Sequence, residues 1–447
     1  MYLQHRQAFL DRLEDGDLAL FPGAGHVIRN HDVEYPFRQQ SDYLYLSGHQ
    51  EADGLLMLAK GIEGLPEAAL FLLPRDPERE TWTGIRLGPE GAMAQLGFEQ
   101  AWPVEELPKR VTEAIHAAER LWYRVGEHPR TDKLVGEVLT AARNKSRLGI
   151  HPPAALMDPT RVLHEQRLHK GEDELQLMRK AAAVSAEAHL LAMAQAAPGV
   201  GEWELEALLD YTFRRNGGRG WAYPSIVAGG ASACVLHYTS NGARLRDGDL
   251  VLIDAGAEFD GYAADITRSF PVNGRFSEVQ RRVYEIVLAA EKASIEKCVP
   301  GQPWAGVHDA SVRVLGEGLR ELGVLEQPLD EIVEKELYKP WYMHNTSHWL
   351  GLDVHDAGSY THGKQPRPLE QGMCLTVEPG LYFPAGDERL PAALRGIGVR
   401  IEDDVLITAG GHEVLTSATP KEVADVEAAC AAARIMPPRL DTELVQS

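Results

Sequence analysis

The sequence predicts an α+β protein with two domains, and two features of the residue pattern support this. Up to His151, short apolar runs alternate with helix-like segments, whereas from Gly171 onwards long amphipathic helices precede groups of strands. The chain has 447 residues, 44% of them hydrophobic, which is enough for two hydrophobic cores. We therefore expect a smaller α/β domain over residues 1–168 and a larger α+β domain over residues 169–447.

The predicted N-terminal domain alternates strands and helices. Apolar runs bounded by Gly and Pro predict buried strands at 18–23, 54–59 and 69–74. Amphipathic spacing predicts helices at 107–120 and 131–145. The segment 151–161 contains three prolines, cannot continue a helix and therefore marks the end of this domain.

The predicted C-terminal domain begins with helices and continues with two groups of strands. Amphipathic patterns predict helices at 172–197, 203–215, 277–297 and 305–322. Apolar runs predict strands at 225–230, 249–259, 262–270, 373–382 and 396–408. Carboxylates interrupt several of these runs. Because strands hold side chains more rigidly than loops do, we expect the functional site to lie on these strands.

The charge balance and the cysteines limit the classes of function. The chain has 45 Lys and Arg against 66 Asp and Glu, a formal net charge of −21, which argues against binding nucleic acid or an anionic membrane surface. The four cysteines lie far apart without a CxxC pair, so neither a disulfide framework nor a structural zinc knuckle is expected. The N-terminus is charged and lacks the apolar core of a signal peptide. We expect a cytoplasmic protein.

An Asp-Gly pair in the first strand group predicts a hairpin that carries two acids. Asp260 and Gly261 lie between two β-rich runs and are typical of a two-residue loop. This register places Asp254 opposite Thr267 and puts Asp265 on the same face. Diagonal neighbours on one face are about 7–8 Å apart, so both carboxylates can reach a shared ion.

The other acids and one histidine favour a metal site. Asp254 alone could face water at the strand end or pair with an arginine such as Arg268, since an unpaired buried carboxylate is costly. However, Glu378 and Glu402 also lie within strand-like apolar runs, and His348 lies in a segment with three histidines. Four carboxylates and one imidazole suit Mn²⁺, with Co²⁺ or Zn²⁺ as alternatives. Five ligands are too many for one catalytic ion with an open position, but they fit two ions about 3.5–4 Å apart.

Several sequence motifs occur in a recognisable order. The C-terminal domain contains CVLHYTSN (234–241), LVLIDAGAEFDGYAADITRSFPVNG (250–274), HNTSHWLGLDVHD (344–356), LTVEPGLY (375–382) and GIGVRIEDDVLIT (396–408). The N-terminal domain contains RNHDVEYPFRQQSDYLYLSG (29–48) and ETWTGIRLGPEGA (80–92). Together these segments resemble the proline-specific pita-bread metallopeptidases, and most closely the aminopeptidase P (Xaa-Pro aminopeptidase) family. The resemblance spans nearly the whole chain and implies a pita-bread catalytic domain at 169–447.

The resemblance implies a set of metal ligands. The matching residues are Asp254, Asp265, His348, Glu378 and Glu402. Asp265 and Glu402 would bridge two Mn²⁺ ions, Asp254 would bind one ion, and the remaining two residues would bind the other.

Further matches lie around the scissile peptide. They are the histidines His237, His344 and His355, the hydrogen-bonded pair Tyr382 and Arg400, and Tyr223 beside the metal-binding aspartates. A single such histidine could be a buried structural residue, but three in motif context favour catalytic roles. Arg400 and Glu402 are two residues apart on one predicted strand and so share a face. Lys364 stands where the family has an arginine, which is a difference in the leaving-group site.

The implied reaction is hydrolysis of the bond between a free N-terminal residue and a following proline in a peptide substrate. Metal ions would lower the pKa of water, and Glu378 would take and return a proton. Prolidase, which cleaves only Xaa-Pro dipeptides, is the alternative, although the short spacings from His348 to Glu378 and Glu402 leave no room for the longer insertions of prolidase-like chains. Non-catalytic binding proteins and metal-free creatinase-like members of this fold lose ligands that are all present here.

The resemblance also implies a homo-oligomer, a tetramer or a dimer, in which the N-terminal domain of one chain borders a neighbour's active site. Asp32 and Trp82 lie in the matching N-terminal motifs and would contact substrate there. The alternative is that Asp32 caps a turn and Trp82 packs in the N-terminal core.

Overall fold

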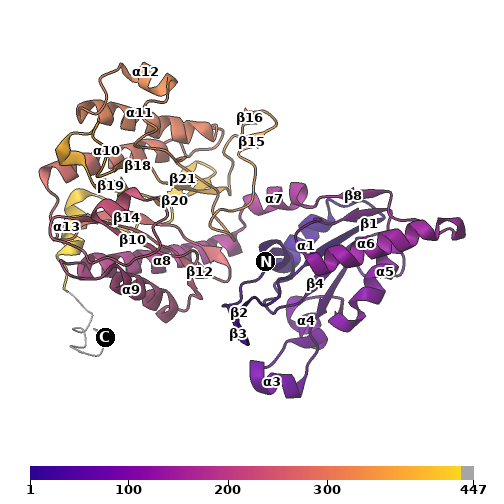
Figure 1. The fold of residues 1–447 in the computed structure, drawn as a ribbon. Coiled ribbons are helices and arrows are strands. Elements are labelled where there is room, and N and C mark those ends of the chain that lie inside the picture. Colours follow the sequence, from indigo (N-terminus) through magenta and orange to yellow (C-terminus); the bar gives the residue numbers. More distant parts are fainter. Residues whose placement is uncertain (434–447) are drawn as a thin grey trace. The chain divides into compact units, whose positions relative to one another are not determined.

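The computed structural model describes residues 1–433, which form two compact units, Met1–Arg167 and a second that begins at Leu168 (Figure 1). Residues 434–447 of the predicted C-terminal domain lie outside the described residues. Both units combine helices with sheets, as the predicted α+β class requires. None of the described helices is long and apolar enough to cross a membrane.

The first unit surrounds a six-stranded sheet. Its strands are β1 (Asp17–Pro22), β4 (Leu55–Lys60), β5 (Ala68–Leu72), β6 (Gln100–Pro103), β7 (Arg120–Trp122) and β8 (Ala155–Met157). Its helices are α1 (Tyr2–Leu10), α2 (Ser41–Ser47), α3 (Pro77–Thr83), α4 (Gly88–Leu96), α5 (Leu107–Ala117), α6 (Pro129–Asn144) and α7 (Thr160–Leu168), which ends at the unit boundary. The strand order is β6-β5-β4-β1-β7-β8, in which only β4 is antiparallel to its neighbours. A separate hairpin joins β2 (Ile28–Asn30) to β3 (Val33–Glu34).

The second unit begins with two long helices and ends in strands. Its helices are α8 (Glu172–Gln195), α9 (Glu202–Arg215), α10 (Glu278–Ile295), α11 (Ala305–Glu321), α12 (Leu329–Glu334) and α13 (Val423–Cys430). Its strands are β9 (Gly220–Trp221), β10 (Ile226–Gly229), β11 (Leu250–Asp254), β12 (Ala257–Phe259), β13 (Tyr262–Ala263), β14 (Thr267–Pro271), β15 (Thr361–His362), β16 (Gln365–Pro366), β17 (Cys374–Val377), β18 (Gly380–Phe383), β19 (Ile397–Arg400), β20 (Asp403–Thr408) and β21 (Gly411–Val414).

Strands such as β10, β14, β18 and β19 lie between two pairs of helices, with α8 and α9 on one side and α10 and α11 on the other (Figure 1). Helix α8 begins where sequence chemistry places it, because the Glu174 carboxylate accepts a hydrogen bond from the Gly171 N–H at 2.8 Å. The apolar faces of these helices and strands share one buried core. The arrangement agrees with the pita-bread fold that the resemblance implied.

The long strands predicted at 249–259, 262–270, 373–382 and 396–408 are each two shorter strands separated by a break. The first two of these predicted strands form the hairpin, and the breaks there leave residues 255–256 and 264–266 outside the ladder. The other two breaks, at 378–379 and 401–402, contain Glu378 and Glu402. The prediction of unbroken strands is therefore wrong at these four places. Apolar periodicity could not reveal the breaks, because the residues around them are as buried as the strands themselves.

Candidate functional site

A cavity of about 620 Å³ opens among the strands of the second unit, and most of the predicted site residues line it. The predicted residues on its wall are Tyr223, His237, Asp254, Asp265, His344, His348, His355, Glu378, Arg400 and Glu402. Tyr382 lies behind the wall, fully buried, and touches two of these side chains. The second unit alone thus brings eleven predicted residues together.

The hairpin forms with the predicted register. Asp260 and Gly261 both have positive φ, 47° and 92°, which is the backbone of a two-residue hairpin turn. Asp254 pairs with Thr267 as expected. The Tyr223 hydroxyl lies 2.7 Å from Oδ1 of Asp254 and is also hydrogen-bonded to Oδ1 of Asp265, so the two carboxylates share a face.

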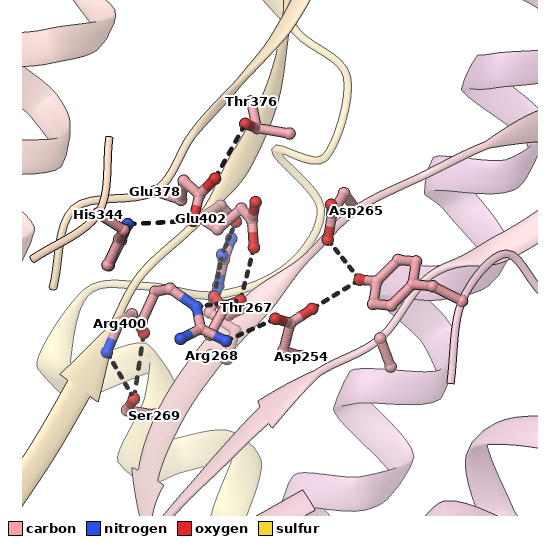
Figure 2. Close-up of polar contacts among 12 residues, drawn as sticks. Asp254, Asp265, Thr267, Arg268, Ser269, His344, Thr376, Glu378, Arg400 and Glu402 are labelled. Atoms are coloured by element: carbon pink, nitrogen blue, oxygen red, sulfur yellow. Dashed lines mark hydrogen bonds and ion pairs between the residues drawn. The ribbon is translucent and has the colours of Figure 1, made fainter. Parts of the chain in front are cut away.

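Glu378 and Glu402 join this pair of aspartates from the two strand breaks, and Figure 2 shows all four acids converging on one region. The Thr267 hydroxyl donates to Glu402 at 2.5 Å, and the Glu402 N–H bonds to the Thr267 carbonyl at 3.0 Å. On the opposite side, the Glu378 N–H bonds to the Thr346 carbonyl at 2.8 Å. Backbone and side-chain bonds therefore fix both glutamates.

His348 is arranged as metal-binding histidines are. Its Nδ1 lies 3.0 Å from the Trp349 carbonyl and donates to it, which leaves Nε2 directed at the acids. Nε2 lies 3.5 Å from both Asp265 and Glu378. Ligand atoms of Asp265, His348 and Glu402 all lie within 4.8 Å of one another.

The acid cluster holds more carboxylates than cations, because among the described residues only the cationic side chains of Arg400 and His348 face its four acids. Burial and the neighbouring carboxylates raise the pKa of Asp265 and, more strongly, that of Glu402, and burial raises the pKa of Glu378 to about 7. Burial alone would lower the pKa of His348, but Asp265 and Glu378 raise it to about 9. Divalent cations would supply the charge that balances these carboxylates. The donor set, oxygen-rich with one imidazole, fits Mn²⁺, Co²⁺ or Zn²⁺.

A chain of hydrogen bonds runs behind the acids. Nη2 of Arg400 lies 2.5 Å from Oδ2 of Asp254, and its Nη1 donates to the Tyr382 hydroxyl at 3.1 Å. The Tyr382 hydroxyl in turn lies 2.8 Å from Nε2 of His344. Because Nδ1 of His344 donates to the Asn345 carbonyl, Nε2 accepts the tyrosine proton. Burial lowers the pKa of His344 to about 3, so its ring is neutral.

The alternative partner considered for Asp254 is wrong. Arg268 points to the other face of β14 and donates from Nη2 to Oδ1 of Asp403 at 2.7 Å. Both of these side chains are fully buried. Arg400, from a distant strand, takes the place beside Asp254 that we had considered for Arg268.

His237 and His355 are the exposed imidazoles of the cavity wall. The ring of His355 packs edge-on against His348, with ring centres 4.4 Å apart. Burial and the nearby His348 lower the pKa of His355. Both rings are therefore accessible to a bound ligand next to the acids.

Asp32 and Trp82 belong to the first unit. Asp32 lies in the exposed turn between β2 and β3, and Trp82 lies on α3. The side chain of Trp82 is 86% exposed, so the alternative that it packs in the N-terminal core is wrong.

Sequence reasoning missed several supporting residues. The Thr267 hydroxyl bonds to both Glu402 and Arg400, and the Asp404 carboxylate accepts from the Asp265 N–H at 3.1 Å. Thr376 accepts from the His348 N–H at 3.1 Å. Each is a polar residue inside an apolar strand run, and that signal could have marked Thr267 and Asp404.

Comparison with known proteins agrees with this geometry. Residues 176–409, more than half of the chain, match the model of metallopeptidase family M24, and residues 2–122 match the N-terminal domain of aminopeptidase P. The chain belongs to metallopeptidase family M24. It is therefore a hydrolase of the aminopeptidase P group, as the motifs implied.

Individual relatives of this M24 peptidase cover almost its whole length. The Xaa-Pro aminopeptidase of Escherichia coli is 41% identical over 97% of this chain and 98% of its own. The Xaa-Pro aminopeptidase of Haemophilus influenzae is 45% identical over 89% of this chain and 90% of its own. An aminopeptidase structure from Pseudomonas aeruginosa has a TM-score of 0.94 and 46% identity, covering 96% of this chain and 97% of that one. The structure of a zinc-substituted E. coli aminopeptidase P in complex with product has a TM-score of 0.93 and 41% identity. The match covers 97% of this chain and 98% of that one.

Proposed function

We propose that this M24 peptidase releases the N-terminal residue from peptides with proline in the second position, using two divalent metal ions. The observation that carries the proposal is the cluster of four carboxylates, three of them buried, and His348 on the wall of a cavity open to solvent. The relatives named Xaa-Pro aminopeptidase, aligned over nearly the whole chain, support the same activity.

The five side chains divide naturally between two ions. Asp265 and Glu402 would help to hold both ions, Asp254 would hold one ion, and His348 with Glu378 would hold the other. We favour Mn²⁺, with Co²⁺ or Zn²⁺ as alternatives, because the donors are mostly carboxylate oxygens. When bound, such ions supply Lewis acidity that lowers the pKa of water and polarises a carbonyl.

The protein's own groups perform the remaining steps. Glu378 faces the cavity and would take the proton of the attacking water and return it to the leaving proline nitrogen. His237 and His355, exposed on the wall, would donate hydrogen bonds to the negative charge that develops on the carbonyl oxygen. Arg400 and Tyr382 would hold Asp254 and His344 in place.

The site suits a free amino terminus. In the proposed holoenzyme two divalent ions would offset the charge of the four carboxylates, so a free amino nitrogen would act as a metal ligand rather than as a counter-ion. Acetylation would remove that donor and add bulk at the amino end of the substrate. Proline has no N–H and a fixed ring, so a wall shaped for the pyrrolidine explains the restriction to proline.

Four peptides test this proposal: Xaa-Pro-Yaa, Xaa-Pro-Yaa-Zaa, acetyl-Xaa-Pro-Yaa and Xaa-Ala-Yaa, each assayed with Mn²⁺. We expect release of the first residue from the first two and almost none from the others. Cleavage confined to an added Xaa-Pro dipeptide would identify a prolidase instead. Bound metal without cleavage of any peptide would contradict the enzymatic proposal and favour a binding protein.

We also propose that the chain forms a homo-oligomer, a tetramer or a dimer. The β2–β3 hairpin and its flanking residues expose Val27, Ile28 and Tyr35, and α3 exposes Trp82. Exposed apolar side chains gathered in this way are typical of an interaction surface. Asp32 at the hairpin turn and Trp82 would then border a neighbour's active site. Sedimentation of the full chain tests this. A monomer at micromolar concentration contradicts it, and Trp82→Ser should weaken assembly while Trp203→Ser, an exposed tryptophan on α9, should not.

A cytoplasmic location is part of the proposal. All four cysteines are free thiols, as in proteins of reducing compartments. Cell fractionation with antibody detection tests the location, and recovery in the periplasmic or secreted fraction would contradict it.

A further inference from the structure

The hairpin that carries Asp254 and Asp265 is missing half of its expected backbone bonds at the break. In a regular antiparallel ladder, a hydrogen-bonded residue pair exchanges two N–H···O bonds. Here Ala255 donates to the Ile266 carbonyl at 3.0 Å and Ala264 donates to the Ala257 carbonyl at 3.1 Å. In this described segment, neither pair shows the second bond.

The two strands of the hairpin lie unusually close together at Gly256. A Cβ atom built on this residue would lie 1.7 Å from the Ala264 carbonyl oxygen, so the two strands approach more closely than any side chain would permit. Asp265 lies directly after Ala264, and Asp254 lies two residues before Gly256. The break therefore lies beside both acids, so the shape of the backbone there bears on where their carboxylates lie.

Two side chains of α8 take the place of the missing ladder bonds. Oγ of Ser185 accepts from the Ala257 N–H at 2.9 Å, and Nε2 of His189 donates to the Ala255 carbonyl at 3.1 Å. Ser185 and His189 are four residues apart on one face of the helix, and both are fully buried. Two of the four freed backbone groups, the Ala255 carbonyl and the Ala257 N–H, thus find partners one turn apart on the same helix.

The buried His189 ring has a cost in folding stability. Its Nδ1 atom is buried without a hydrogen-bond partner among the described residues, and an unsatisfied buried acceptor is unfavourable. Burial lowers the pKa of His189 to about 4, so the ring is neutral and carries its single N–H on Nε2. A leucine would fill this space without the penalty. The gain that offsets the penalty is therefore the bond from Nε2 to Ala255.

We propose that Ser185 and His189 are positioning residues that hold the broken hairpin in the one shape in which Asp254 and Asp265 face a shared metal site. This inference rests on the metal site of the proposed function. It assigns to α8 a role in metal affinity, although neither side chain touches the cavity.

Titration of the metal-free full chain with MnCl₂, followed calorimetrically, tests the proposal. Removing an outer hydrogen-bond partner typically weakens metal binding about 10–100-fold, and we expect this for Ser185→Ala and His189→Leu. His189→Gln offers an amide N–H near the position of Nε2 and should restore affinity to within about threefold. In the metal-free Ser185→Ala variant, the amide hydrogen of Ala257 should exchange with solvent about tenfold faster than in the metal-free parent chain.

Ser294→Ala is the matched control. Ser294 is also a fully buried helical serine whose hydroxyl bonds to a backbone carbonyl, that of Val307, but it lies on α10. It should lose similar stability without loss of Mn²⁺ affinity. Parent-like affinity in Ser185→Ala overturns the proposal even if His189→Leu fails to fold, and so does an equal loss in Ser294→Ala. The proposal is also overturned if His189→Gln loses as much Mn²⁺ affinity as a folded His189→Leu variant does. A parent chain that binds no Mn²⁺ overturns the proposed function together with this inference.

Discussion

The guanidinium of Arg400 lies 2.5 Å from the carboxylate of Asp254, although 146 residues separate them along the chain. Both side chains are buried, and the remaining donors of Arg400 reach Thr267 and Tyr382. A fork of donors in fixed directions is what arginine offers and lysine does not. Arg400 thus links the hairpin of β11 and β14 to the strand break that carries Glu402.

Replacing Arg400 should impair catalysis more than substrate binding. Arg400→Met leaves Asp254 and Tyr382 without their common donor, and we expect kcat to fall about 100-fold, the usual effect of removing one placed donor. Arg400→Lys keeps the charge without the fork and should give an intermediate value. Steady-state assays on Xaa-Pro-Yaa with saturating Mn²⁺ measure this. A kcat for Arg400→Met within threefold of the parent would contradict the role.

The metal content of two variants should differ. Asp265→Asn removes a proposed bridge and should cost both ions, whereas Asp254→Asn should mainly loosen one. The parent chain loaded with excess Mn²⁺ should approach two equivalents. Elemental analysis after gel filtration measures the content, and one tight equivalent in the parent would refute the two-ion site.

Asp42 should make the first unit sensitive to acid. Burial opposes ionisation, but the hydrogen bonds and charges of His164 and Arg167 lower the pKa of Asp42 to about 2. The unfolded carboxylate has a pKa near 3.9, so the unfolded state binds more protons between these values. Asp42 therefore contributes stability above about pH 4, about 2 kcal/mol in size, and this contribution disappears as the pH falls towards 2.

The Asp42→Asn variant tests this linkage. It should lose about 3 kcal/mol at pH 7, because the buried ion pair with Arg167 is broken, and its stability should vary less between pH 4 and pH 2. Urea titrations followed by hydrogen exchange in peptides of β1 and β4 report on this unit alone. Asp11→Asn, an exposed aspartate, should behave like the parent. An unchanged acid profile in Asp42→Asn would contradict the assignment.

A second buried ion pair should separate stability from activity. Nζ of Lys170 lies 2.9 Å from Oδ2 of Asp356, and both side chains are 1% exposed. Lys170→Met should cost about 3–5 kcal/mol, and Lys170→Met with Asp356→Leu should recover most of it. Asp356 directly follows His355 and also accepts from the Asp353 N–H, so the double variant should fold well yet keep a low kcat. Thermal unfolding and kcat measured together check this, and full recovery of both would contradict it.

The hairpin and the acids differ in how far the sequence could predict them. The register of β11 and β14 follows from a two-residue turn at Asp260 and Gly261, because a loop of that length allows one pairing. Local chemistry was therefore sufficient there. The resemblance supplied the list of site residues, and the second unit brings those that lie in it to one cavity.

Contacts between distant segments were not predictable in the same way. Arg268 was considered for Asp254 because it is near in sequence, yet strand alternation turns it to the opposite face, where Asp403 binds it. Arg400 and Glu402 were placed on one strand, but the strand ends at Arg400 and Glu402 lies in the break. Their side chains still meet at Thr267, since both bond to its hydroxyl.

The bridge between Thr267 and Glu402 has a consequence for the order in which the chain folds. The Asp254–Asp265 hairpin closes a short loop and can form early, whereas Glu402 must return across more than 130 intervening residues, an entropically slow step. On the ribosome, a nascent chain that has not yet reached Glu402 holds only part of the cluster. Metal ions that need the complete cluster would therefore bind only after this long-range contact has formed.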